Sequence, residues 1–225
     1  MPMSQRSIAA RAALHAALGD PARLAIVEEL LHTDRAPVEL RRRLGLPSNL
    51  LAHHLDVLEH VRLVERSPSS GDGRRCYVRL RRDTLGGISF SSPRRPRRAL
   101  FVCTANSARS QLAAVLWTHL TGAAASSAGT HPADAVHQGA IAAARRAGLD
   151  LTHSSPKALA SRASSASLVI TVCDRAHEEL DPPDEWLHWS IADPVPSGTR
   201  AAFDATMAEL EQRITDLATP MKAAR

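Results

Sequence analysis

Cys103 and Arg109 are separated by five residues in the run Cys103–Ser110, which lies between an apolar stretch of strand type at 99–102 and a stretch with helical spacing at 111–120. In a tight loop between a strand and a helix, backbone N–H groups and the helix N-terminus form a nest for an anion, and the same field lowers the pKa of a thiol. An arginine fork binds two oxygens of such an anion. The spacing therefore predicts a loop that holds a tetrahedral oxyanion against the Cys103 thiolate; a buried structural cysteine is the alternative.

The same run contains two side chains that can support this chemistry. We expect Ser110 to donate a hydrogen bond to the Cys103 thiolate and keep it ionised, and we expect Asn106 to brace the loop by bonding its backbone. The expected oxyanion ligands are the loop residues together with the arginine: Thr104, Ala105, Asn106, Ser107, Ala108 and Arg109.

A sheet is needed to position this loop. The periodicity predicts strands at 99–102, near 124–128, at 168–172 and near 187–190, with helices at 110–120, 134–147 and about 200–217. This alternation indicates an α/β three-layer domain with a central parallel sheet, in which ligands bind at the carboxyl ends of the strands.

Two other residues with useful chemistry also follow predicted strands. Asp193, in an Asp-Pro pair after the last strand, is expected to protonate a leaving oxygen, although such a pair is also common in ordinary turns. Cys173 follows the strand at 168–172 and is either a second reactive thiol or a buried strand-end thiol. His177 lies near Cys173, but this pair has too few ligands for a metal, so we expect no metal site.

Composition limits the class of protein. The chain has 225 residues, of which 44% are hydrophobic but only 3% aromatic, so its cores must be mainly aliphatic. Three cysteines do not make a disulfide framework, and no apolar run is long enough for a signal core or a membrane span. We therefore expect a cytoplasmic protein that does not bind membranes, in which a cysteine is more often reactive than cross-linked.

Charge is divided unevenly along the chain. Residues 1–98 hold eighteen arginines against ten acidic residues, a formal charge of +8, whereas residues 99–225 carry a charge of −3. This difference predicts two domains with different partners, and the partner of the basic first domain is expected to be a polyanion. A solvated basic surface without a partner has the same composition. The predicted organisation is a first domain at 1–85, a linker rich in Pro, Ser and Arg at 86–98, and a second domain at 99–225.

The first domain has the pattern of an α+β winged helix-turn-helix. The sequence predicts helices at 4–18, from Asp20-Pro21 onward, at 38–44 and at 46–60, then strands at 63–64 and 76–80 joined by a Gly-rich turn. The last helix of such a unit enters the DNA major groove, and the wing contacts phosphates. The expected DNA contacts are Ser48, Asn49, His53, His54, Arg74 and Arg75, with partial burial as the alternative for the histidines.

The run Leu44–Leu58, with Leu63–Arg66 after it, resembles the ArsR-type family of arsenical-resistance repressors over roughly residues 5–85. The resemblance implies a homodimeric repressor that binds an operator and releases it when a metal or metalloid binds. Many members carry a Cys-x-Cys pair on the helix that matches 38–44, and this chain has no cysteine there. Because Cys76 alone is a poor site for a three-coordinate soft ion, DNA binding carries over but the inducer site does not.

The second domain resembles the low-molecular-weight tyrosine phosphatase fold, in its arsenate-reductase branch, over roughly residues 98–219. The resemblance rests on the Cys103–Ser110 loop, Ser127–Thr130, His188-Trp189 and Asp193-Pro194. It implies Cys103 as nucleophile, Arg109 as anion ligand and Asp193 as general acid.

Departures from the family pattern bear on the substrate and on electron transfer. Tyrosine phosphatases of this fold usually carry aromatic residues after Asp-Pro, whereas Val195–Gly198 has none, which favours arsenate over phosphotyrosine. Ala108 and Leu180 stand where cysteines of an internal relay are often found, so a three-cysteine relay is impossible. We expect either Cys173 or an external small thiol to complete the reduction, with a thioredoxin- or glutaredoxin-like partner as reductant and no tightly bound cofactor.

The leading hypothesis is a bifunctional arsenic-resistance protein, in which a DNA-binding repressor is joined to a thiol-dependent arsenate reductase. Two alternatives remain. One is a transcription factor whose phosphatase-like domain only senses arsenate or phosphate, and the other is a low-molecular-weight phosphatase.

Overall fold

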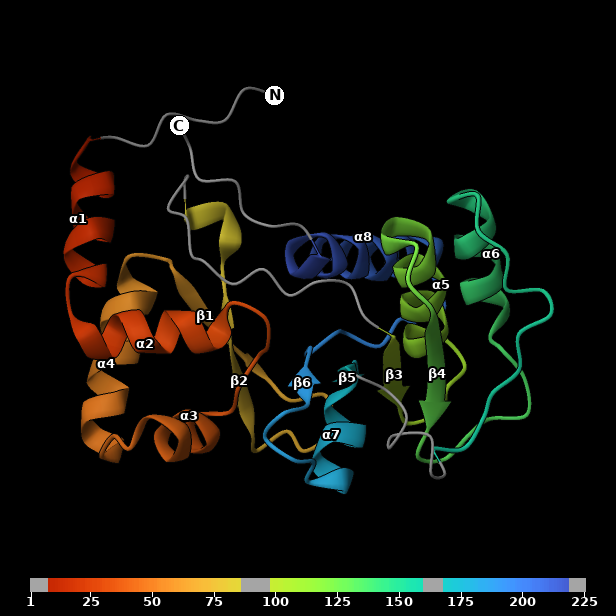
Figure 1. The fold of residues 1–225 in the computed structure, drawn as a ribbon, viewed down its shortest axis with the longest axis horizontal. Helices are drawn as coiled ribbons and strands as arrows, with labels where there is room; N and C mark the ends of the chain where they lie inside the picture. The colour runs from red at the N-terminus through yellow and green to blue at the C-terminus, as the bar shows by residue number, and fades with distance from the viewer. Residues whose placement is uncertain (1–7, 86–97, 160–167, 219–225) are drawn as a thin grey trace. The chain divides into compact units, whose positions relative to one another are not determined.

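The computed structural model describes residues 8–85, 98–159 and 168–218 (Figure 1). Among these, residues 8–68 and 75–85 form a first compact unit, and residues 69–74, 98–159 and 168–218 form a second. All but the last residue of the predicted linker at 86–98 lies outside the described residues. Within the described ranges, no helix is long and apolar enough to cross a membrane.

Four helices and a hairpin make up the first unit. They are α1 (Ile8–Leu18), α2 (Pro21–Leu30), α3 (Pro37–Leu44) and α4 (Ser48–His60), followed by β1 (Val64–Pro68), β2 (Cys76–Leu80) and a 3₁₀ turn, η1 (Arg82–Thr84). Strands β1 and β2 pair antiparallel, from Val64 opposite Leu80 to Pro68 opposite Cys76.

Local sequence explains where these helices begin and end. The Asp20 carboxylate caps α2 by accepting the Arg23 N–H at 3.0 Å, and Pro21 occupies the first helical position, where its missing N–H costs nothing. Gly45 ends α3 with φ of 65°, a left-handed conformation that glycine adopts without steric cost.

A small aliphatic core holds the first unit together. Leucines at helical spacing on α4, among them Leu55 and Leu58, pack against Ile26 and Leu30 of α2 and against Val78 of β2. The same spacing places His54 on the inner face of α4, where it is only 5% exposed.

The second unit alternates strands and helices. Its elements are β3 (Ala99–Cys103), α5 (Arg109–Thr121), β4 (Ala125–Gly129), α6 (Gln138–Arg146), β5 (Leu168–Thr171), α7 (Asp174–Leu180), β6 (Leu187–His188) and α8 (Arg200–Ala218). The strands form one parallel sheet in the order β4-β3-β5-β6, so β3 lies between two neighbours. The predicted parallel sheet is confirmed.

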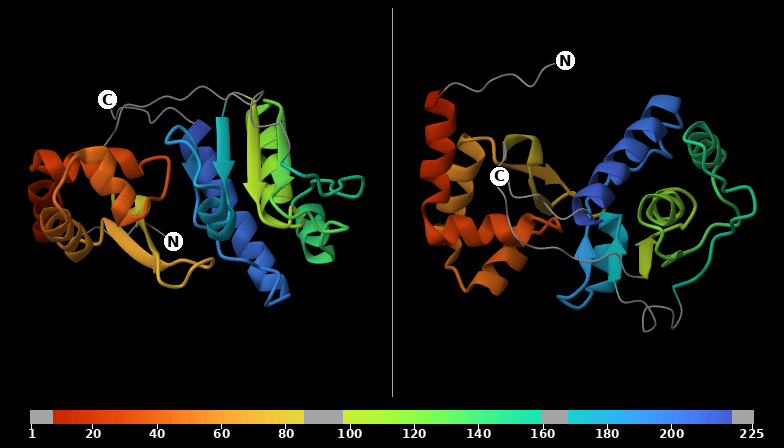
Figure 2. Two further views of the ribbon diagram at one scale, coloured as in Figure 1. Left: turned by 90° about the horizontal axis from the view of Figure 1, so that it is seen from below. Right: turned by 45° about the horizontal axis from the view of Figure 1, so that its top comes forward.

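Both faces of this sheet are buried, as a layered α/β domain requires. Phe101 points into the larger core, with Leu112 and Trp117 of α5 and Leu210 of α8, whereas the alternate residues Leu100 and Val102 pack in a smaller core near Leu180 of α7. Figure 2 shows α5, α6 and α8 gathered on one side of the strands.

The differences from the predicted elements are local. The short helix α7 is absent from the prediction, and β6 ends at His188 rather than near residue 190. Helix α6 begins at Gln138 instead of residue 134, because His137 caps it by accepting the Gly139 N–H at 3.0 Å.

We expect Leu210→Ala to destabilise the second unit by about 2–5 kcal/mol, since Leu210 is fully buried and its truncation leaves a cavity. All three tryptophans lie after residue 98, so chemical denaturation followed by tryptophan fluorescence reports on the second unit alone. The neighbouring exposed residue provides the control, Glu211→Ala, which should leave the midpoint nearly unchanged. Equal effects of the two substitutions would contradict this packing.

Candidate active site

Every carbonyl group of the loop between β3 and α5 accepts a hydrogen bond. The carbonyls of Cys103, Thr104, Ala105 and Ser107 accept N–H groups from the segment 130–137, at 2.9–3.1 Å. Those of Asn106 and Ala108 accept from Gln111 and Leu112 of α5. With its carbonyls engaged in this way, the loop is free to aim its N–H groups inward, and the Asn106 N–H lies 3.2 Å from Cys103 Sγ. This is the arrangement of an anion nest.

A close approach of two backbones makes this hydrogen bonding possible. Gly129 ends β4 beside the loop, and a Cβ added there would lie 2.6 Å from the Thr104 carbonyl oxygen and 3.0 Å from Asn106 Cβ. Real Cβ atoms do not tolerate the shorter distance, so only glycine fits at the end of β4.

The Asn106 side chain connects the loop to three other residues. Asn106 is fully buried and has a φ of 48°. Its Oδ1 accepts the backbone N–H of Lys157 at 2.8 Å and the Gln111 amide at 3.1 Å. Because a backbone N–H can only donate, the Lys157 contact fixes which amide atom is oxygen. The Asn106 NH₂ group is thereby directed at Ser110 Oγ, 2.7 Å away.

This orientation determines the direction of the bond between Ser110 and Cys103. Since Ser110 Oγ accepts from Asn106, its own hydrogen is free to point at Cys103 Sγ, which lies 3.0 Å away. The Ser110 hydroxyl is completely buried, so this donor is held without competition from water. This geometry fits the predicted role of Ser110. The Asn106 side chain, which was expected to bond the loop backbone, instead bonds the Lys157 backbone and the side chains of Gln111 and Ser110.

Burial raises the pKa of the Cys103 thiol, which is only 3% exposed. The hydrogen bond with Ser110 and the charge of Arg109 act in the opposite direction but do not outweigh burial. The loop and helix field were expected to lower this pKa, and burial acts in the opposite direction. Desolvation of a thiolate is the physical reason.

Arg109 and Asp193 contact each other at the mouth of the loop. One terminal nitrogen of Arg109 donates to Asp193 Oδ2 at 2.7 Å, and the other donates to the Ile191 carbonyl at 3.0 Å. The backbone N–H of Val195 holds the second carboxylate oxygen of Asp193 at 3.1 Å. The chain thus brings Asp193 to the arginine that is expected to bind the anion, and both terminal nitrogens of Arg109 are engaged.

Cys173 also lies at the loop. Its Sγ is 3.3 Å from Thr104 Oγ1, and it is buried in the same core as Cys103. Cys76, the third cysteine, belongs to the first unit, and none of the three forms a disulfide.

A buried polar network fixes the chain after Cys173. His188 Nε2 donates to Asp174 Oδ1 at 3.1 Å, and His188 Nδ1 lies 2.9 Å from the Thr171 hydroxyl, which also contacts His177 at 3.0 Å. Burial raises the pKa of Asp174, but the hydrogen bonds to its carboxylate, first that of His188, outweigh it and lower this pKa to about 2. The ionised Asp174 therefore anchors the start of α7 beside Cys173.

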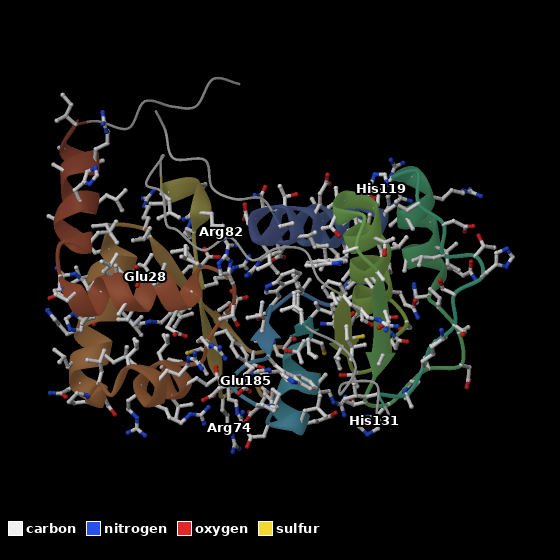
Figure 3. All side chains as sticks on the ribbon, viewed as in Figure 1. Glu28, Arg74, Arg82, His119, His131 and Glu185 are labelled. Carbon is white, nitrogen blue, oxygen red and sulfur yellow. The ribbon has the colours of Figure 1, made fainter. Side chains whose placement is uncertain are left out.

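A charged cluster lies just after the carboxyl end of β4. His131, labelled in Figure 3, follows β4 and has a side chain that is 71% exposed. Its ring lies 3.4 Å from Glu179, which also accepts from Thr130 at 3.0 Å and from Arg175 at 3.0 Å.

The predicted DNA contacts divide into two groups. Ser48, Asn49 and His53 are exposed on α4, and Arg74 (labelled in Figure 3) and Arg75 are exposed before β2. His54 is buried, with Nδ1 3.8 Å from Asp20 Oδ1, so its prediction as a DNA contact is wrong. Among the described residues, no cluster of three or more His, Cys, Asp or Glu side chains could hold a metal.

Residues 98–225 match the family model described as low molecular weight phosphotyrosine protein phosphatase. The chain therefore belongs to this family, whose domain fills its second half. No curated protein matches the chain.

Solved structures share the fold of this domain. They include a mutant of YwlE from Bacillus subtilis, with 22% identity over 54% of this chain and 96% of that chain and a TM-score of 0.50. The YwlE arginine phosphatase from Geobacillus stearothermophilus has 27% identity over 55% and 91%, with a TM-score of 0.48. An arsenate reductase in the phosphate binding state has 23% identity over 54% and 96%, with a TM-score of 0.47. The match with a TM-score of 0.50 shows a shared fold and leaves the substrate open.

Gln111 and the backbone N–H of Lys157 were not predicted from the sequence. Gln111 joins α5 to the loop, because its amide donates to the carbonyls of Asn106 and Ser155 at 3.0 and 3.1 Å. The only sequence signal for Gln111 is its place in the first turn of α5, directly after the loop. Gly129 was noted as part of Ser127–Thr130, but its steric role becomes visible only when β4 lies beside the loop.

We expect Ser110→Ala to raise the pKa of Cys103 further, because the thiolate loses a hydrogen-bond donor. A hydrogen bond to a charged group contributes about 1.5–3 kcal/mol, which corresponds to roughly one to two pH units. The pH profile of Cys103 alkylation by iodoacetamide, in a Cys76→Ser, Cys173→Ser background, should shift to higher pH by this amount. Ser107→Ala is the control, and an unshifted profile for Ser110→Ala would contradict the inferred direction of the bond.

We expect Asp193→Asn to tighten the binding of inorganic phosphate, because the neutral amide competes less well for Arg109. An ion pair of this partly exposed kind contributes up to about 1 kcal/mol, or roughly fivefold in affinity. Titration calorimetry of the ligand-free protein measures this directly, with Glu185→Gln as an exposed control for the same change in charge. Weaker phosphate binding by Asp193→Asn would show that Asp193 assists the anion rather than competing with it.

Proposed function

We propose that the second unit is a thiol-dependent arsenate reductase and that the first unit is a DNA-binding repressor, which makes the chain a bifunctional arsenic-resistance protein. The observation that carries the reductase proposal is the second buried thiol, Cys173, at 3.3 Å from the Thr104 hydroxyl of the anion loop. A phosphatase needs one thiol, whereas reduction of arsenate consumes two.

The proposed first step is attack of the Cys103 thiolate on arsenate. An S–As bond forms, one As–O bond breaks, and Asp193 protonates the oxygen that leaves as water. Arg109 turns from Asp193 to the oxyanion, and the loop N–H groups Thr104 to Arg109 bind the remaining oxygens.

In the proposed second step, another thiolate attacks Cys103 Sγ. The S–As bond breaks and its electron pair passes to arsenic, which leaves as arsenite, while the two sulfurs form a disulfide. Cys173 is the nearer candidate for this thiol, and an external small thiol is the alternative. A thioredoxin- or glutaredoxin-like protein then returns the disulfide to two thiols.

Phosphatase activity is the second candidate function, and the contact of Asp193 with Arg109 favours it equally. An acid beside the anion ligand suits the transfer of a phosphoryl group to Cys103 with protonation of the leaving alcohol. The absence of an aromatic ring in Val195–Gly198 argues for a small substrate in that case. A third possibility is a domain that binds arsenate or phosphate without turning it over.

An arsenate reduction assay separates these functions. Wild-type protein with a thiol-recycling mixture should release arsenite, and Cys103→Ser should abolish release. If Cys173 is the second thiol, Cys173→Ser should lower the rate with protein dithiols by about 10²-fold or more, because an intramolecular reaction becomes bimolecular. Phosphate-ester hydrolysis without arsenite release would favour the phosphatase, and neither activity would favour the sensor.

The DNA-binding proposal rests on the order of elements α2-α3-α4-β1-β2 and on charge. Helix α3, the Gly45 turn and α4 follow one another as a helix-turn-helix pair does, and the antiparallel hairpin follows as a wing. The exposed candidates for contact are Ser48, Asn49 and His53 on α4, with Arg74 and Arg75 for phosphates. The proposed assembly is a homodimer on an operator in the cytoplasm, where thiols stay reduced.

Fluorescence anisotropy with a fragment of the chain's own promoter tests this proposal. We expect binding that weakens steeply with salt, and Arg74→Gln with Arg75→Gln should reduce the slope of log K against log salt by about one for each phosphate that is no longer bound. His53→Ala should reduce preference for the promoter over unrelated DNA, whereas His119→Ala, in the second unit and labelled in Figure 3, is the control. Binding without any preference for the promoter would contradict the repressor proposal.

A further inference from the structure

A cavity of about 360 Å³ lies within the first unit, between α3, the start of α4 and the β1–β2 hairpin. It is lined by Val38 and Arg41 of α3, Ser48 and Leu51 of α4, Arg66 of β1 and Cys76 of β2, among others. The volume suits a small organic molecule. The reductase chemistry makes no use of this space, and of the proposed DNA contacts only Ser48 lines it.

The charged groups that line the cavity are all cationic. Arg41 contacts only the Ser48 hydroxyl among the described residues, at 3.4 Å, so no carboxylate balances its charge there. Arg66, by contrast, is paired with Asp56 at 2.6 Å and Glu59 at 3.6 Å. Arg41 is therefore the group available to bind an anion.

The start of α4 adds to the positive electrostatic potential that the arginines create in the cavity. Ser48 is the first residue of this thirteen-residue helix, and no side chain caps it at Pro47. The uncapped N–H groups and the helix dipole both favour an anion at this end. Two independent features, the unbalanced guanidinium and the uncapped helix, thus point to negative charge at one end of the cavity.

The rest of the wall is apolar. Leu51 is 3% exposed and forms the inner part, and Val38, which is 61% exposed, extends the apolar surface to the rim. An exposed valine beside a cavity is a surface that an apolar ligand body would cover. Inorganic phosphate or arsenate would leave this wall unused.

We propose that this cavity is a binding site for a compact organic anion, an aromatic or branched body that carries one carboxylate. The carboxylate meets Arg41 and the start of α4, and the body packs on Leu51 and Val38. Cys76, half-buried in the same wall, gives the site a chemical reporter.

The proposal also supplies a route for regulation, and this part rests on the proposed DNA binding of α4. A ligand in the cavity touches Ser48, one of the expected DNA contacts, so ligand and operator compete for the same end of the helix. By linkage, each then weakens the binding of the other by the same factor. Such a site would give the first unit an effector that does not need the missing pair of cysteines on α3.

Benzoate is a suitable probe. Benzamide is its neutral counterpart, and inorganic phosphate is an anion that has no apolar group. The full chain is treated with N-ethylmaleimide, and alkylation of each cysteine is followed by peptide mass spectrometry. We expect benzoate at twice its dissociation constant to slow alkylation of Cys76 about threefold, because protection scales as 1 + [L]/Kd. Benzamide and phosphate should protect clearly less.

Arg41→Gln should remove the protection by benzoate, and Arg42→Gln, the same change on the next residue of α3 outside the cavity, should retain it. Circular dichroism confirms that both variants are folded. Equal protection by phosphate, equal protection by benzamide, or protection that survives Arg41→Gln would each overturn the proposal.

The regulatory part has its own measurement. Benzoate should weaken promoter binding by the wild-type chain and by Arg42→Gln but not by Arg41→Gln. Protection of Cys76 without any effect on promoter binding would overturn the competition and leave the binding site standing. If the chain binds no DNA at all, the proposed repressor function fails, while the alkylation result still decides the cavity.

Discussion

The backbone N–H of Lys157 donates to Asn106 Oδ1, and the chemistry of the thiol site depends on this contact. It orients the Asn106 amide, which in turn orients the Ser110 hydroxyl toward Cys103. The left-handed backbone of Asn106 and the missing Cβ of Gly129 allow the loop to close at this point. The Lys157 N–H, which comes from a distant segment, therefore determines which groups donate and which accept along the chain of Asn106, Ser110 and Cys103. A change that moved Lys157 would act on the thiolate without touching it.

The sequence predicted the parts of the site that are local and periodic. Cys103, Arg109 and Ser110 belong to one loop, and Asp193 follows a strand, so spacing alone located them. Lys157 could not be found in this way, because a backbone donor fifty-one residues from Asn106 has no sequence signature. Helix α7 was missed because seven residues give too few turns for a periodic signal. His54 was misassigned although it stands three residues after Leu51 and four before Leu58, a spacing that belongs to the buried face of α4.

The two candidate activities use one geometry and differ in what happens after Cys103 has attacked. Arg109 and Asp193 serve both, because phosphate and arsenate have the same shape and charge. Cys173 separates them, since a second thiol is required only where electrons must be delivered. The buried Asp174–His188 pair bears on this difference, because it fixes the chain that carries Cys173 and leaves little freedom for that thiol to move.

The position of β3 in the sheet has a consequence for the lifetime of the thiol. Hydrogen bonds to β4 on one side and β5 on the other hold the strand that ends at Cys103. Fraying of a sheet begins at its edges, so amide hydrogens of β3 should exchange with solvent only when the whole domain opens. An oxidant consequently reaches Cys103 through the mouth of the loop and not through local unfolding. An anion bound in the loop would then shield the sulfur, and occupancy of the site would set how long the Cys103 thiol escapes irreversible oxidation.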